Sequence, residues 1–109
     1  MKKSEIGMVR ISNQYRDRDR SQGMIYELRW GDEKLVLRSK QSADTSAQWR
    51  FSAHPMASPQ LAIIGEWGAT RIEAFRAMRD LWTAKGPSLG LAKFDWDQVA
   101  TALTEVRAL

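Results

Sequence analysis

Few side chains in this sequence have the chemistry and spacing of a catalytic centre. The single histidine, His54, lies two residues after Ser52, and no carboxylate is placed to orient its ring, so the pair does not predict a hydrolytic triad. Because the chain has no cysteine, it has neither a thiol nucleophile nor a thiolate metal site. We therefore expect His54 to be an ordinary loop histidine.

Metal and nucleotide chemistry are equally poorly supported. A transition-metal site with one histidine and no cysteine would need several converging carboxylates, and the acidic residues are not spaced for that. Asp95 and Asp97 are close together, but they stand at the expected start of a helix, where free amides favour negative charge. The glycines have the spacing of neither a Walker loop nor a dinucleotide-binding loop. We expect no cofactor, no metal and no enzymatic activity, and an enzyme built from other polar residues is the third alternative.

Basic side chains supply the remaining candidate site. The net charge is +4, and residues 1–23 carry six basic and three acidic side chains, so most of the excess lies in this N-terminal arm. More basic side chains project from neighbouring expected strands, away from the apolar core, where they could follow a phosphate backbone. The candidate binding residues, which include one aromatic residue after the last expected strand, are Arg16, Arg18, Arg20, Arg29, Arg38, Lys40, Arg50 and Trp67. Simple solvation of an exposed sheet by Lys and Arg is the plainer interpretation, and no aromatic pair is expected there for base stacking.

Alternating apolar residues predict the strands that must position these side chains. Residues 24–30, "MIYELRW", and 34–40, "KLVLRSK", alternate clearly, and "GDE" between them predicts the turn of a hairpin. Residues 47–53, "AQWRFSA", predict a strand with Trp49 and Phe51 inward and Arg50 outward. Residues 61–67, "LAIIGEW", are apolar on both faces and predict a central or well-covered strand.

Two helices are expected after the strands. Thr70 and Glu73 have the spacing of a capping box before an apolar stripe, so the first helix begins at Thr70. It ends where Gly86, expected in a left-handed conformation, precedes Pro87. Asp95 caps a second helix whose apolar surface is wide. That helix must lie against the sheet, the first helix or another copy of the chain.

Together these elements predict an α+β fold, in which two C-terminal helices pack on one face of an antiparallel four-stranded sheet. Residues 1–23 form a basic arm, where "EIGMVRIS" could add a fifth, N-terminal edge strand, and residues 24–109 form a single α+β domain. Apolar side chains converge beneath the helices, including the four tryptophans Trp30, Trp49, Trp82 and Trp96. The arginine-bearing face of the sheet is then the outside.

The missing catalytic residues and the surplus apolar surface favour a small regulatory or adaptor protein that acts through protein–protein contacts. We expect it to self-associate, as a homodimer, through a sheet edge or through the apolar C-terminal helix. The alternative is a nucleic-acid-binding protein that uses the basic outer face and the arm. No stretch reaches the length of about 20 apolar residues that crosses a bilayer, so we expect a cytoplasmic protein without a membrane partner.

Overall fold

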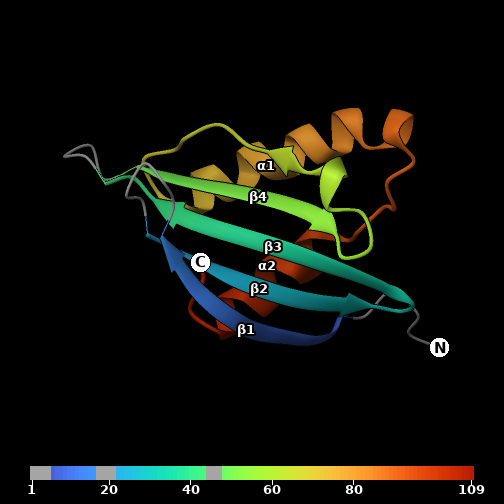
Figure 1. Cartoon of the computed structure of the whole chain (residues 1–109), viewed down its shortest axis with the longest axis horizontal. Helices are drawn as coiled ribbons and strands as arrows, with labels where there is room; N and C mark the ends of the chain where they lie inside the picture. Colours follow the sequence, from blue (N-terminus) through green and yellow to red (C-terminus); the bar gives the residue numbers. More distant parts are fainter. Residues whose placement is uncertain (1–5, 17–21, 44–47) are drawn as a thin grey trace.

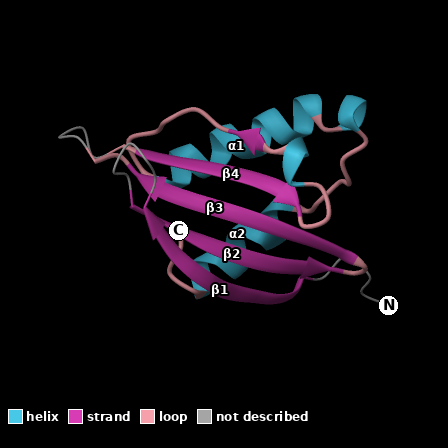
Figure 2. Cartoon of the chain, in the orientation of Figure 1, coloured by secondary structure: helices cyan, strands magenta, loops and turns pink. Residues whose placement is uncertain are grey.

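A computed structural model, which describes residues 6–16, 22–43 and 48–109, shows one antiparallel sheet with both helices against the same face (Figure 1). The strands join in the order β1-β2-β3-β4-β5, so each pairs with its neighbours in sequence. Their bounds are Ile6–Arg16 (β1), Gln22–Trp30 (β2), Glu33–Gln41 (β3), Trp49–Pro55 (β4) and Ile63–Ile64 (β5). Helices α1 (Arg71–Lys85) and α2 (Trp96–Glu105) follow (Figure 2). The predicted α+β class is confirmed, and the optional N-terminal edge strand is present as β1.

Alternation along β3 and β4 separates the core from the outer face of the sheet. The core-facing residues Leu35, Leu37, Ser39, Phe51 and Ala53 are buried, and Val36 on the outer face is buried as well. The pairing sets Arg38 opposite Ser52 and Lys40 opposite Arg50, and residues directly opposite share a face. Phe51 is fully buried whereas Arg38 is exposed, so the predicted inside and outside of the sheet are confirmed.

Both helices close the core through aromatic contacts. From α1 the buried side chains are Ala74, Phe75, Met78 and Trp82, and from α2 they are Val99 and Leu103. The Phe75 ring meets the rings of Phe51 and Trp96 edge to face, with centroids 5.7 and 6.0 Å apart. Trp82 meets Trp96 in the same way at 5.6 Å. Because α2 also contacts β1, its wide apolar surface lies against the sheet of its own chain.

Side-chain caps begin both helices as predicted. The Thr70 hydroxyl accepts a hydrogen bond from the Glu73 amide at 3.1 Å, although the Glu73 carboxylate returns to the amide of Ala69 and not of Thr70. The Asp95 carboxylate accepts from the amides of Asp97 and Gln98. These caps satisfy amides that have no partner within the helix.

The predicted conformation of Gly86 is wrong. Its φ is −55°, within the right-handed region, and its amide continues the helical pattern by donating to the Trp82 carbonyl at 2.7 Å. A side chain is excluded there because a Cβ would lie 2.5 Å from that carbonyl oxygen. Gly90, with φ +73°, takes the left-handed conformation after the 3₁₀ turn Pro87–Leu89.

The predicted central strand over residues 61–67 is also wrong. Of residues 61–67, only the two residues of β5 form a ladder with β4. This short strand lies at the edge of the sheet, and its Ile64 is 56% exposed. Beyond β5, the Gly65 amide donates to the Phe51 carbonyl of β4 at 2.9 Å, and Gly68 and Trp49 exchange two hydrogen bonds of 2.8 Å. Gly65 also packs closely on α1, where a Cβ would lie 2.7 Å from the Met78 nitrogen. Residues 61–67 therefore contain a short edge strand, β5, followed by a corner at Gly65 that packs on α1.

Candidate functional site

A hollow on the outer face of the sheet brings together three of the predicted binding residues. Arg38 and Lys40 come from β3 and Arg50 comes from β4, and all three line one cavity with a volume of about 390 Å³. In the described part of the chain, no acidic side chain lines it. The helices lie on the far side of the sheet, so this cavity is open to solvent (Figure 1). Its basic side therefore attracts anions.

Apolar residues form the opposite side of the same hollow. Pro59 belongs to the 3₁₀ turn Pro59–Leu61, Ala62 follows that turn, and Ile64 lies in β5. All three are exposed. The turn contacts β4 and so borders the hollow beside that strand. A ligand in this hollow would meet positive charge on one side and apolar surface on the other.

Trp67 lies beside the basic side of the hollow and contacts two of its cations. The Arg50 guanidinium carbon is 4.5 Å from the centroid of the Trp67 ring, and the Lys40 ammonium nitrogen is 5.5 Å from it. Both distances fit cation–π interactions. Trp67 and Arg50 are each half-buried, and the buried Nε of Arg50 has no hydrogen-bond partner within the described residues. The ring thus holds two cations that come from adjacent strands.

His54 lines the hollow from β4, so its predicted loop position is wrong. The strand continues through Pro55 because the proline stands at the end of the ladder, where its missing amide hydrogen is tolerated. Nδ1 of His54 lies 2.7 Å from the Pro55 carbonyl oxygen. Since a carbonyl oxygen only accepts, Nδ1 must carry the hydrogen, and Nε2 is the nitrogen left for another partner. Ser52 lies two residues earlier in β4 and lines the same hollow.

The other predicted binding residues do not join this site. Arg29 is exposed on β2, opposite Lys34, and does not line the hollow. Arg16 ends β1, where its backbone pairs with Gln22. Arg18 and Arg20 lie outside the described residues.

Sequence reasoning missed the polar and apolar residues of the hollow. Ser52 and His54 follow Arg50 at intervals of two, and this spacing in a strand was a readable signal that they share a face. No local pattern indicated that the turn at Pro59 folds back against β4.

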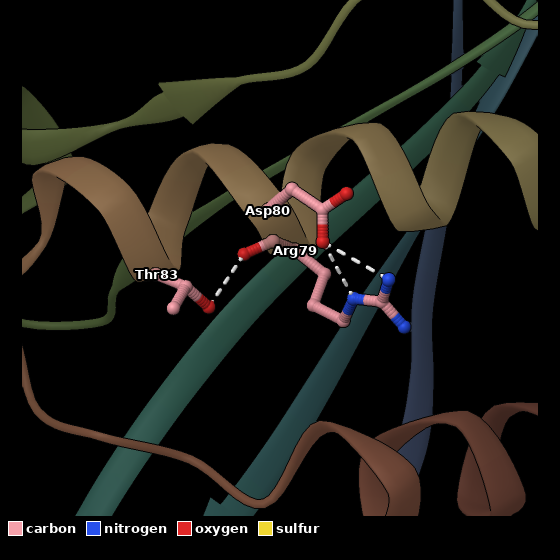
Figure 3. A network of polar contacts seen from close by, with 3 residues as sticks. All are labelled: Arg79, Asp80 and Thr83. Carbon is pink, nitrogen blue, oxygen red and sulfur yellow. Dashed lines mark hydrogen bonds and ion pairs between the residues drawn. The ribbon is translucent and has the colours of Figure 1, made fainter.

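Basic side chains on the helix side of the molecule are arranged differently. Figure 3 shows Arg79 of α1 joined to the neighbouring Asp80, whose carboxylate oxygen lies 3.0 Å from Nε and 2.9 Å from a terminal nitrogen. The Thr83 hydroxyl donates to the Arg79 carbonyl at 2.9 Å. Exposed ion pairs such as Arg79–Asp80 contribute about 0–1 kcal/mol to the free energy of unfolding. The Arg79–Asp80 pair also neutralises positive charge on this part of α1.

A second cavity lies at the C-terminal end of α1. Its volume is about 250 Å³, and its lining includes the aromatic rings of Trp82, Phe94 and Trp96. The Trp82 indole nitrogen is already bonded to the Ala92 carbonyl at 3.0 Å. This cavity offers a ligand mainly apolar contacts, so it gives less indication of ligand chemistry than the hollow.

Neither a metal cluster nor a membrane span occurs in the described ranges. Across residues 6–16, 22–43 and 48–109, no three His, Asp or Glu side chains are grouped to hold a metal ion. In the same ranges, no helix has the length and apolar character needed to span a bilayer.

The chain was compared with models of known protein families, with curated proteins and with solved structures, and none of the three comparisons finds a match. The hollow and its surroundings are therefore the basis for a functional assignment.

Proposed function

We propose that this protein binds nucleic acid through the outer face of its sheet, with backbone phosphates held at the hollow. The observation that carries this proposal is the convergence of Arg38, Lys40 and Arg50 on one open cavity. Arginine can bind a phosphate through two parallel hydrogen bonds, and lysine adds a mobile positive charge. The backbone of a nucleic acid supplies phosphates at regular intervals along the strand.

The contact between Arg50 and Trp67 supports this role. A free arginine side chain loses conformational entropy when it binds a ligand, and this loss weakens binding. Arg50 is already held against the indole ring, with 4.5 Å between the guanidinium carbon and the ring centroid. Part of the entropy cost is therefore met during folding, which leaves more of the interaction with phosphate for affinity.

A regulatory or adaptor role through self-association is the second candidate, and one observation favours it. β1 is eleven residues long and has β2 as its only neighbour among the described strands, so its other edge can pair with another strand. Among the side chains of residues 22–43 and 48–109, the exposed large apolar ones are Ile64, Ile72 and Leu89. Light scattering at high micromolar concentration tests this role, because a stable homodimer supports it and a strict monomer contradicts it.

Fluorescence anisotropy with labelled single-stranded and duplex oligonucleotides tests the nucleic-acid proposal. Three phosphate contacts predict a slope of about −2 for the logarithm of the affinity against the logarithm of the salt concentration on a single strand. Arg38→Ala and Arg50→Ala should each weaken binding and make that slope shallower by about 0.7. Arg76→Ala is the matched control, because Arg76 is exposed on α1 on the other side of the sheet. Binding that is absent, insensitive to salt, or equally reduced by Arg76→Ala would contradict the proposal.

A further inference from the structure

The hollow has two chemically different sides that lie within one small volume. Arg38, Lys40 and Arg50 form the basic side, and Pro59 and Ile64 belong to the apolar side. About 390 Å³ is near the lower end of the roughly 300–1,000 Å³ that is usual for sites of small ligands. Such a volume takes one charged group with one compact apolar group attached.

Polar groups along β4 lie between these two sides. Arg50, Ser52 and His54 are alternate residues of one strand, so their side chains follow one another at intervals of about 7 Å. The Ser52 hydroxyl can donate or accept a hydrogen bond. Because Nδ1 of His54 is used by the Pro55 carbonyl, Nε2 is available as an acceptor when the ring is neutral. These groups suit the polar edge of a nucleobase.

We propose that the hollow holds one unpaired nucleotide, with its phosphate against the basic side and its base over Ile64 and Pro59 beside His54. This inference rests on the proposed function for the source of the nucleotide, a single strand of nucleic acid. A base stacked and paired within a duplex cannot enter a cavity, whereas a base of a single strand can be turned out at small cost. The protein therefore prefers single strands to duplexes, and a free nucleoside monophosphate binds the same site weakly.

Apolar contact replaces aromatic stacking in this arrangement. The Trp67 ring already has Arg50 and Lys40 over it, so that ring is occupied by cations. Ile64 is 56% exposed, which leaves its surface for the face of a base.

NMR titration of ¹⁵N-labelled full-length protein with adenosine monophosphate, adenosine and inorganic phosphate tests the inference. Adenosine monophosphate should bind more tightly than either fragment, shift amide signals of β4 and the Pro59–Leu61 turn, and compete with the labelled single strand. Ile64→Ser should lower the affinity for the monophosphate and for the single strand about five- to tenfold, and it should leave the salt dependence of single-strand binding unchanged. Ile72→Ser is the matched control, because Ile72 is an exposed isoleucine on α1.

The outcomes separate this inference from the proposed function. If oligonucleotides bind with the expected salt dependence but duplexes bind as well as single strands and the monophosphate binds no better than phosphate, the inference is wrong and the proposed function stands. If the monophosphate binds in an Ile64-dependent way but no oligonucleotide binds, the nucleotide site stands and the proposed function is wrong. Equal effects of Ile64→Ser and Ile72→Ser overturn the assignment of the base to this hollow.

Discussion

Replacing Gly65 with alanine tests how closely the corner after β5 packs on α1. A Cβ at this position would lie 2.7 Å from the Met78 nitrogen and 2.8 Å from the Met78 Cα. Ordinary contacts begin near 3.4 Å, so the corner and the helix must separate by about 0.7 Å. Because the clashing atoms belong to the backbone of a helix, no side-chain rotation can relieve them.

The expected loss of unfolding free energy is about 2–3 kcal/mol, at the upper end of the range for an overpacked core. The free energy of unfolding of a protein of this size is about 5–15 kcal/mol in total, so the Gly65→Ala protein should remain folded but be clearly less stable than the parent. Urea unfolding followed by tryptophan fluorescence and by far-UV circular dichroism measures the difference. With a slope of about 1–2 kcal/mol per molar urea, the midpoint should fall by about 1–3 M.

Gly90→Ala provides the comparison for this experiment. No atom lies within 4 Å of a Cβ at Gly90, so its cost comes only from the positive φ of +73° and is about 1–2 kcal/mol. A Gly65→Ala protein within about 0.5 kcal/mol of the parent would refute the close approach of the corner to Met78.

Three further substitutions test other contacts. Thr70→Ala removes the hydroxyl that accepts from the Glu73 amide and should lower the unfolding free energy by about 1 kcal/mol, whereas Thr70→Ser should change it by a few tenths, as measured in urea. Phe51→Ala empties a fully buried position beside Phe75 and should cost about 3–5 kcal/mol, so a thermal transition close to that of the parent would contradict the burial of this ring in the core. Trp67→Leu removes the ring beneath Arg50 and should weaken single-strand binding about 2- to 30-fold, the equivalent of about 0.5–2 kcal/mol. Arg50→Ala should then reduce the binding affinity less in the Trp67→Leu protein than in the parent. If anisotropy measurements show that the two losses are fully additive, the ring does not position Arg50.

Alternation made the sheet and its two faces predictable from the sequence. Phe51 and Arg50 are neighbours with opposite environments, and the period of two in β4 assigned each correctly to the core and to the outer face. The caps at Thr70 and Asp95 were predictable for a similar reason, because the atoms that interact lie within three residues of each other.

Non-local contacts explain what the sequence did not predict. The residue after β5, Gly65, approaches Met78, which lies in a helix that begins later in the chain, and local periodicity does not reveal such a contact. The hollow depends on the turn at Pro59 folding beside β4, so His54 and Ile64 meet Arg50 only in the folded protein. Trp67 reaches Arg50 and Lys40 across a stretch where the pairing with β4 is interrupted, and local periodicity carries no information about such an interruption.

The contact of α2 with β1 has a consequence for the order of folding. Every strand pairs with its neighbour in sequence, so the hairpins need only short loops to close and can form quickly. α2 must instead return across most of the chain to reach β1. Until α2 docks, the part of the sheet's apolar face that this helix covers is exposed to solvent. We therefore expect the chain to be more prone to aggregation before α2 docks than afterwards.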